Sequence, residues 1–159
     1  MKKRFTLIRK SCHCEGAFTL IELLVVVSLI GVLATLVIAN MNSARERARD
    51  AQRKSDLRNI QTALRLYYND NTGYPQSNTG NILGCDGVCV WGEAWVSDGV
   101  TYMNILPDDP LTSQAYIYTG VVGGEDYTLM ACLENKSDDK GVAVATTTCV
   151  SGYKYEVKP

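Results

Sequence analysis

The chain has 159 residues, with 16 Lys and Arg against 17 Asp and Glu and a net charge of −1. Residues 1–17 hold five of the basic residues and one acid, which leaves 11 basic and 16 acidic residues and a net charge of −5 after them. This acidic remainder argues against general electrostatic attraction to nucleic acid or to anionic lipid.

The first strong pattern along the chain is an apolar run. Residues Leu23 to Ala39 carry no charge, and Gly31 is the one helix-weakening residue among them. With Phe18–Ile21 the run reaches the ~20 residues needed to cross a bilayer. The basic residues precede it, so the N-terminus should stay in the cytoplasm while the rest is exported. The alternative is an ordinary secretory signal cut near Ala34 to Ala44, which the smooth continuation into helical sequence disfavours.

The residues around this run carry a family resemblance. The stretch "GAFTLIELLVVVSLIGVLATLVIA" resembles the processing and assembly segment of type IV pilins and type II secretion pseudopilins. The resemblance implies a basic leader, residues 1–17, that prepilin peptidase removes on the cytoplasmic side before methylating the new N-terminal residue. It also implies a Glu at the fifth mature position. The rest of the chain matches the family by architecture and by looser motifs.

The cleavage register has two candidates one residue apart. A cut after Gly16 follows the residue that the family prefers, but makes Ala17 the first residue and Glu22 the sixth. A cut between Ala17 and Phe18 makes Phe18 the first residue, to be N-methylated, and Glu22 the fifth. We favour the Ala17–Phe18 bond, because two family features agree there against one.

Glu22 needs an explanation, because an ionised carboxylate at the centre of a membrane costs at least ~2.5 kcal/mol by insertion scales. It could lie in the headgroup layer, favoured by the helix dipole. It could also form a capping box with Thr19, whose T-x-x-E spacing fits. The family suggests a third role, in which Glu22 pairs with the free N-terminal amine of an adjacent subunit during assembly. We favour this third role, which is compatible with the second.

A long helix should follow without a break. No Pro or Gly occurs between Val32 and Asn71, and we expect one helix from about Phe18 to Asn69. Residues 18–40 would form its transmembrane and assembly half, and residues 41–70 its amphipathic half.

The second half of this helix carries two stripes of residues at helical spacing. One consists of the apolar residues Leu57, Ile60, Leu64 and Tyr67, which should pack under a globular head. The other consists of Ala44, Ala48 and Ala51. These small side chains would let a neighbouring helix approach closely; the alternative is that they are only good helix formers on a solvated surface.

The stretch Arg45–Arg65 is rich in arginine, with seven basic and three acidic residues. Such a stretch is usually a solvated helix face. Set against the acidic remainder of the chain, it could instead form ion pairs between subunits, which would make a filament sensitive to salt.

Residues 71–159 lose the helical periodicity and should form the head. We expect strands at "AYIYT" (115–119), "YTLMACL" (127–133), "VAVATTT" (142–148) and "YKYEV" (153–157). Together they predict a small antiparallel sheet folded on the helix, an α+β pilin-like fold. The turn "LPDDP" (106–110) resembles a proline-flanked turn of related pilins. Trp91 and Trp95 are expected to pack in the core rather than to bind a ligand.

Six cysteines divide at the apolar run. Cys12 and Cys14 precede it and should stay reduced, whereas four follow it into an oxidising space: Cys85, Cys89, Cys132 and Cys149. Four cysteines allow three pairings. We favour Cys85–Cys89, which is local, and Cys132–Cys149, which would tie the C-terminal tail to a strand. Zinc is the competing interpretation, but no C-x₂-C pair supports it.

The acidic segment "ENKSDDKG" (134–141) offers clustered oxygen ligands. Some secretion pseudopilins bind calcium in a C-terminal loop, which makes Asp138 and Asp139 candidate ligands. The spacing is not that of an EF-hand, so we favour an acidic solvated turn. No other cofactor is expected.

Enzyme activity is not expected. The single histidine, His13, lies in the leader, and the chain has no glycine-rich phosphate loop followed by Lys.

We therefore expect a structural prepilin. Its expected partners are copies of itself in a helical filament, prepilin peptidase, an inner-membrane assembly platform and membrane lipid, with no direct nucleic-acid binding. It would start in the cytoplasmic membrane and end in a cell-surface or periplasmic filament. A type IV pilus subunit is placed slightly ahead of a type II secretion pseudopilin, because of the two head disulfides and the weak calcium candidates. The alternative from another class is a single-span, membrane-anchored extracytoplasmic binding protein that keeps residues 1–17 and acts as a monomer.

Overall fold

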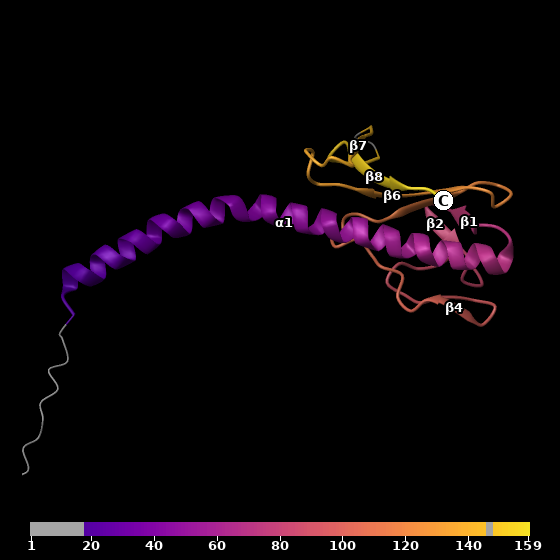
Figure 1. Ribbon diagram of the computed structural model, residues 1–159, viewed down its shortest axis with the longest axis horizontal. Coiled ribbons are helices and arrows are strands. Elements are labelled where there is room, and N and C mark those ends of the chain that lie inside the picture. Colours follow the sequence, from indigo (N-terminus) through magenta and orange to yellow (C-terminus); the bar gives the residue numbers. More distant parts are fainter. Residues whose placement is uncertain (1–17, 146–147) are drawn as a thin grey trace, which may run out of the picture. The chain divides into compact units, whose positions relative to one another are not determined.

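The structure is a computed structural model that describes residues 18–145 and 148–159. It separates into two compact units, residues 1–40 and 41–159, which are described one at a time. Helix α1 (Leu20–Asn71) runs through both, and eight short strands follow it (Figure 1). The predicted α+β fold, a long helix followed by antiparallel sheets, is confirmed.

Both ends of α1 have a local cause. At the start, the backbone N–H of Glu22 donates to Thr19 Oγ1 at 3.3 Å, and that of Leu23 donates to the Thr19 carbonyl, so Thr19 is the N-cap. At the end, Thr72 adopts φ 55°, a left-handed conformation that commonly terminates helices. The observed helix is 52 residues long and lies two residues later at each end than the predicted range of 18–69.

The strands of the second unit form three antiparallel sheets. The first sheet pairs β1 (Gln76–Asn78) with β2 (Asn81–Leu83), and the second pairs β3 (Trp95–Ser97) with β4 (Val100–Met103). The third has the order β5-β6-β8-β7, formed by β5 (Ile117–Gly120), β6 (Tyr127–Cys132), β7 (Val142–Ala143) and β8 (Tyr153–Val157).

The third sheet contains the four strands that the sequence predicted, with β7 shortened to two residues. The two small hairpins were not predicted. Their turns are nevertheless marked in the sequence, because Thr79-Gly80 and Asp98-Gly99 all adopt positive φ, as a two-residue hairpin turn of type I′ requires. The Asp-Gly pair is a strong hairpin signal, but flanking strands of three and four residues show too little alternation to be recognised.

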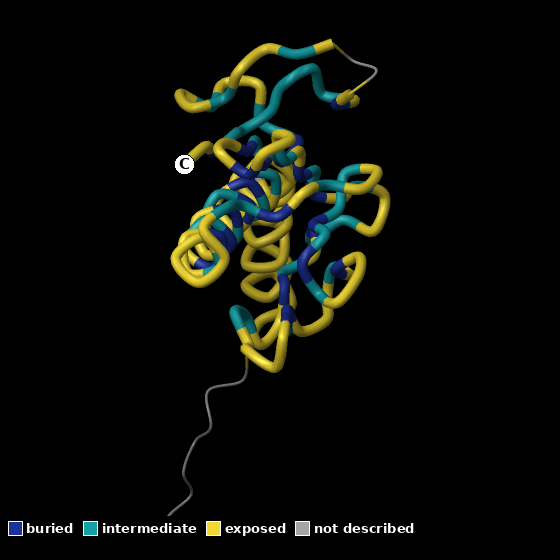
Figure 2. Tube along the Cα trace, turned by 90° about the vertical axis from the view of Figure 1, so that its right-hand side faces the viewer, coloured by how far each residue is buried: buried dark blue, intermediate teal, exposed yellow. Residues whose placement is uncertain are grey.

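The core lies between the second half of α1 and the sheets, where Figure 2 shows the buried residues together. Leu57, Ile60 and Leu64 are fully buried, and Tyr67 packs against the same cluster, as the periodicity predicted. The sheets contribute mainly aromatic and aliphatic side chains: Ile82, Trp95, Tyr116, Tyr118, Tyr127 and Leu129. The exposed face of this half of α1 includes the alanine stripe, Ala44, Ala48 and Ala51.

One close approach joins the segment after the helix to the third sheet. The Tyr118 hydroxyl donates to the carbonyl of Pro75 at 2.6 Å. A Cβ added to Gly120 would lie 2.4 Å from the same carbonyl oxygen, so this position of β5 requires glycine. The segment that leaves α1 is thereby held against the edge of the sheet.

Candidate functional site

The first candidate site is the apolar part of α1. All side chains from Phe18 to Ile38 are exposed, including those of Leu23, Leu24 and Ile30. Within the described residues α1 is the one helix long and apolar enough to cross a membrane, judged by length and composition. Such a continuous exposed apolar surface needs lipid or other chains around it in place of water.

The two hydroxyl side chains that lie within α1 between Leu20 and Ile38 do not break its apolar character. Ser28 Oγ donates to the carbonyl of Val25 at 2.8 Å, and Thr35 Oγ1 donates to that of Val32 at 2.7 Å. Each hydroxyl is therefore satisfied by the backbone of its own helix, as a polar group in hydrocarbon must be. Glu22 is then the one ionisable side chain between Phe18 and Ile38.

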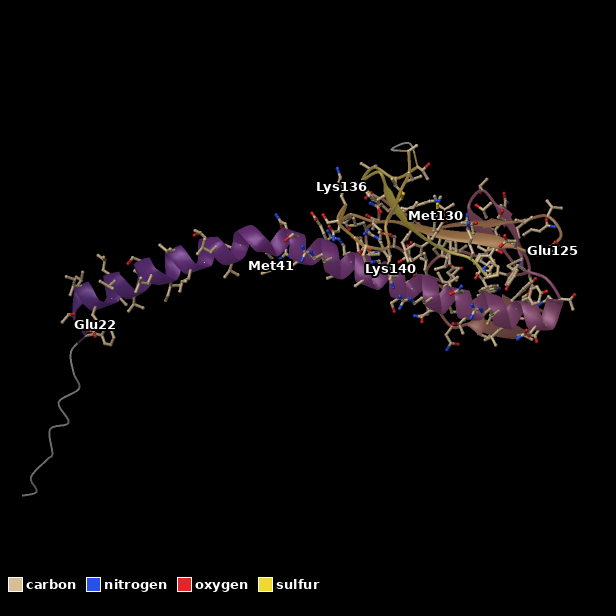
Figure 3. The ribbon with its side chains drawn as sticks, turned by 45° about the horizontal axis from the view of Figure 1, so that its top comes forward. Glu22, Met41, Glu125, Met130, Lys136 and Lys140 are labelled. Atoms are coloured by element: carbon tan, nitrogen blue, oxygen red, sulfur yellow. A yellow bond between two sulfur atoms is a disulfide. The ribbon has the colours of Figure 1, made fainter. Side chains whose placement is uncertain are left out.

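Glu22 lies in the first turn of α1 (Figure 3). Its N–H donates to Thr19 Oγ1, and the Thr19 hydroxyl in turn lies 3.5 Å from Glu22 Oε2. The cap expected from the T-x-x-E spacing is therefore present on the threonine side, but the carboxylate faces the threonine hydroxyl rather than a backbone N–H. The Glu22 carboxylate is exposed and keeps capacity for a further donor.

Of the three predicted processing residues, the structure describes one. Phe18 is 73% exposed and precedes the helix, whereas Gly16 and Ala17 lie outside the described residues. His13, Cys12 and Cys14 lie outside them as well. The cleavage register stays a prediction.

The second candidate site is a buried ionic cluster that joins α1 to two loops of the head. Arg53 is fully buried, and its guanidinium donates to Asp109 through Nε at 2.8 Å and through Nη2 at 2.9 Å. Its Nη1 donates to Asp50 at 2.8 Å and to Glu134 at 2.7 Å. The three carboxylates raise the pKa of Arg53 despite its burial, so the guanidinium stays charged.

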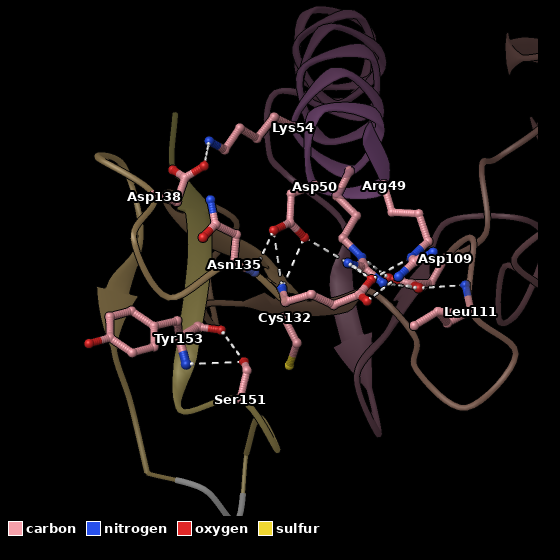
Figure 4. Close-up of polar contacts among 12 residues, drawn as sticks. Arg49, Asp50, Lys54, Asp109, Leu111, Cys132, Asn135, Asp138, Ser151 and Tyr153 are labelled. Atoms are coloured by element: carbon pink, nitrogen blue, oxygen red, sulfur yellow. Dashed lines mark hydrogen bonds and ion pairs between the residues drawn. The ribbon is translucent and has the colours of Figure 1, made fainter. Parts of the chain in front are cut away.

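The acids of this cluster also hold the loops by their backbones. Asp109 Oδ1 accepts the N–H of Leu111 at 2.8 Å, which fixes the turn "LPDDP". Asp50 accepts the N–H groups of Glu134 and Asn135, at 3.0 and 2.8 Å, so the segment after β6 is attached to the helix (Figure 4). Hydrogen bonds from Arg49, and then from Arg53, lower the pKa of Glu134 against the opposing effect of its burial.

The calcium candidates lie in the loop after this segment. The Asp138 carboxylate is engaged on both oxygens. Lys54 Nζ donates to Oδ2 (Figure 4), and the N–H of Lys140 donates to Oδ1. The Lys54 ammonium also lies 5.8 Å from the ring centre of Tyr155. Burial opposes ionisation of Asp138, but these donors outweigh it and lower the pKa of the carboxyl.

A calcium ion at Asp138 would have to compete with an ammonium group. Lys54 supplies the positive charge next to Asp138, and the described residues contain no group of three His, Cys, Asp or Glu placed to hold a metal. Asp138 is therefore part of a partly buried ion pair and not simply a solvated acidic turn. Asp139 is exposed.

Both disulfides of the structure follow the favoured pairing. Cys85 bonds to Cys89, and Cys132 bonds to Cys149. The second pair is separated by 17 residues in the sequence and closes a loop near the C-terminus. Trp95, next to the first disulfide, is buried and donates Nε1–H to the carbonyl of Gly84 at 2.8 Å. Trp91 packs edge-on against Tyr116, so both tryptophans have the packing role that the sequence predicted.

The ionic cluster was not predicted from the sequence. Arg49 and Arg53 were expected on a solvated face or in ion pairs between subunits, whereas both bind acids of the head in the same chain. A signal was present, because Arg53 lies four residues before Leu57 and therefore on the buried stripe. Its partners Asp109 and Glu134 are 56 and 81 residues away and could not be matched to it from local patterns.

Comparisons with known proteins agree with this division of the chain. The model of the prokaryotic N-terminal methylation motif matches residues 12–38, which include Gly16, Ala17, Phe18 and Glu22. The model of type II secretion system protein G matches residues 40–143, more than half of the chain. The chain belongs to the type II secretion system protein G family.

Curated members of the protein G family align with it. The type II secretion system core protein G of Pseudomonas aeruginosa is 34% identical over 121 residues, 74% of this chain and 84% of that protein. The core protein G of Pectobacterium carotovorum is 34% identical over 103 residues, 64% of this chain and 65% of that protein. The Escherichia coli protein is 43% identical over 66 residues, 42% of this chain and 46% of that protein. The chain thus spans less than two thirds of the last two relatives. No solved structure matches it.

Membership of the protein G family corrects one expectation. From the sequence, the two head disulfides and the weak calcium candidates favour a type IV pilus subunit slightly over a secretion pseudopilin. The comparisons support the pseudopilin instead, because residues 40–143 match protein G itself. Disulfides reflect an oxidising compartment and do not distinguish the two classes of filament. The family is structural, and the chain is not an enzyme.

Proposed function

We propose that this chain is the filament-forming subunit of a type II secretion pseudopilus. In this proposal it is inserted in the cytoplasmic membrane with its N-terminus inside, cut by prepilin peptidase, and polymerised on an inner-membrane platform into a periplasmic filament. One observation carries the proposal: an exposed apolar helix with a methylation motif precedes a protein G head.

Processing and assembly are linked in this proposal by Glu22. Cleavage between Ala17 and Phe18 creates a free amine, which becomes N-methylated and keeps its positive charge. That amine would then meet the Glu22 carboxylate of an adjacent subunit as the apolar helices pack together. Support comes from the exposed carboxylate in the first helical turn and from the absence of any cation in Phe18–Ile38 that could neutralise it.

The mass of the mature protein tests the processing step. The two cleavage registers differ by one alanine, so mass spectrometry of the purified filament subunit separates them. The proposal expects a chain that starts at a methylated Phe18. A chain that retains residues 1–17 and stays monomeric in the membrane would contradict the proposal and favour the membrane-anchored binding protein.

Substitution of Glu22 tests the assembly step. Glu22→Gln and Glu22→Ala should be inserted and processed normally but should be absent from filaments, because neither side chain can neutralise the neighbouring amine. The matched control is Glu46→Gln, which removes one negative charge from the same helix outside the apolar segment. Normal filament assembly by both Glu22 variants would refute the pairing.

A further inference from the structure

Three arginines of α1 form a line on its exposed side. Arg47, Arg58 and Arg65 are separated by eleven and seven residues, and eleven and eighteen residues are close to three and five full turns of an α-helix. The three residues therefore lie in one row that extends over about 27 Å of the helix. Lys54, seven residues after Arg47 and four before Arg58, lies in the same row but binds Asp138 of the head. All three arginines are exposed, and none makes an ion pair with any residue of the described ranges 18–145 and 148–159.

The neighbouring cations of the helix behave differently. Arg49, Arg53 and Lys54 point to the head and bind Glu134, Asp109 and Asp138. The head of the same chain thus neutralises Arg49 and Arg53 but leaves Arg45, Arg47, Arg58 and Arg65 without an ion pair in the described part of the chain. We call Arg47, Arg58 and Arg65 the arginine row.

The head has the complementary excess. No Lys or Arg occurs between Arg65 and Lys136, whereas nine acids do. Two of these acids, Asp109 and Glu134, are paired with Arg49 and Arg53. The other seven are exposed and form no ion pair within the described part of the chain. Asp70 lies in the last turn of α1, and six belong to the head: Asp86, Glu93, Asp98, Asp108, Glu125 and Asp126.

We propose that the arginine row binds the acidic outer surface of the head of a second copy of this chain. The inference rests on the proposed function and names the surface that two subunits share outside the membrane. Each copy carries both an unneutralised row and an unneutralised acidic head, so head-to-tail contacts can repeat along a filament. The contact would fix the register between subunits by charge complementarity, which favours specificity and rate of association more than affinity.

The surface next to the row suits a close contact. Ala44, Ala48 and Ala51 lie along the adjacent exposed edge of the same helix and present no bulky side chain. A neighbouring head could therefore approach the helix closely enough for its carboxylates to reach the guanidinium groups. Partial exclusion of water from such a contact would strengthen ion pairs that are weak when fully solvated.

Charge reversal of the row tests the inference. The test variant combines Arg47→Glu, Arg58→Glu and Arg65→Glu in the full-length chain, expressed together with its prepilin peptidase and assembly platform. The matched control combines Arg45→Glu, Lys136→Glu and Lys140→Glu, which changes the charge equally at exposed positions outside the row (Figure 3 labels both lysines). Filaments are sheared from the cells, counted by electron microscopy and quantified by immunoblotting.

The row variant should be processed and inserted in the membrane but should yield about tenfold fewer filaments than the natural chain. The control should stay within about twofold of it. An equal loss in the control would assign the effect to net charge and overturn the inference. Filaments of normal yield from the row variant would also overturn the inference.

Charge reversal on the head of the row variant gives a second test of the inference. In the row variant, the exposed acids of the head are replaced one at a time by Lys: Asp86, Glu93, Asp98, Asp108, Glu125 and Asp126. At least one replacement should restore filaments, because each subunit then carries the reversed pair. If none does, the acidic head is not the partner and the inference fails.

Failure of the inference can be told from failure of the proposed function. If the natural chain yields no filaments and stays monomeric in chemical crosslinking, both are wrong. If the natural chain assembles and the Glu22 variants do not, while the row variant assembles normally, the proposed function stands and the inference alone is wrong.

Discussion

Arg53 and Asp109 lie 56 residues apart and form two parallel hydrogen bonds, of 2.8 and 2.9 Å, between side chains that are both fully buried. The pair connects the middle of α1 to the loop before β5. Asp50 and Glu134 both accept from Nη1 of the same guanidinium, so a single arginine links the helix to two segments of the head. The head is thus held on the helix by an ionic cluster as well as by the apolar core.

Arg53→Met should strongly destabilise the head. The substitution leaves the Asp109 carboxylate buried without its partner, and loss of one member of a buried ion pair typically costs about 3–5 kcal/mol. Thermal unfolding of the full-length chain in detergent, followed by near-ultraviolet circular dichroism, measures the effect. The matched control is Arg58→Met at an exposed position of the same helix, which should stay within about 0.5 kcal/mol of the natural chain. Equal stability of the two variants would show that the cluster does not hold the head.

Glu134 should contribute to the loss of stability in acid. Its pKa in the folded chain is lowered from 4.5, chiefly by hydrogen bonds from Arg49 and Arg53. A carboxyl with a lowered pKa stabilises the fold above its unfolded pKa, and that contribution is lost as the pH falls through the folded pKa. We therefore expect the melting temperature to be flat near neutral pH and to fall below about pH 4.5.

Glu134→Gln isolates this contribution. The variant should melt below the natural chain at pH 7, and the difference should shrink as the pH falls, since the glutamate then becomes uncharged too. Glu93→Gln, an exposed site without an ion pair in the described structure, is the control and should follow the natural chain at all pH values. A difference for Glu134→Gln that is independent of pH would show that charge on this side chain is not what stabilises the loop.

Local patterns in the sequence predicted much of this fold and one part of the candidate site. The helix and its buried stripe follow from the 3.6-residue periodicity of Leu57, Ile60 and Leu64, because that periodicity reports directly which face is covered. The Glu22 segment was identified by a motif whose residues are contiguous. The ionic cluster was not predicted, because Arg53 meets acids that only the folded loops bring to it. The two short hairpins were missed because strands of three and four residues carry too little alternation.

The two disulfides should differ in their contribution to stability. In the chain-entropy model the contribution grows with the length of the closed loop, and the sequence separations are 17 for Cys132–Cys149 and four for Cys85–Cys89. Replacement of Cys132 and Cys149 by Ala should lower the free energy of unfolding by about 3 kcal/mol, and the same change at Cys85 and Cys89 by about 2 kcal/mol. Chemical unfolding of the oxidised full-length variants measures both. A larger loss from the short loop would mean that contacts of Cys85 and Cys89 with the core, rather than loop closure, set the contribution.

The stability of the head should not depend on calcium. Lys54 already provides a cation for Asp138, and the backbone N–H of Lys140 engages the other carboxylate oxygen, so a calcium ion would have to displace an internal ion pair. Addition of millimolar calcium or of a chelator should therefore change the melting temperature of the natural chain by less than about 1 °C.

Asp138→Asn should lower the melting temperature by a few degrees, equivalent to about 1 kcal/mol, because Lys54 loses its charged partner. The matched control Asp139→Asn, at the exposed neighbouring position, should change it little. A rise of several degrees with calcium in the natural chain, absent from Asp138→Asn, would show instead that the metal replaces Lys54 at this carboxylate.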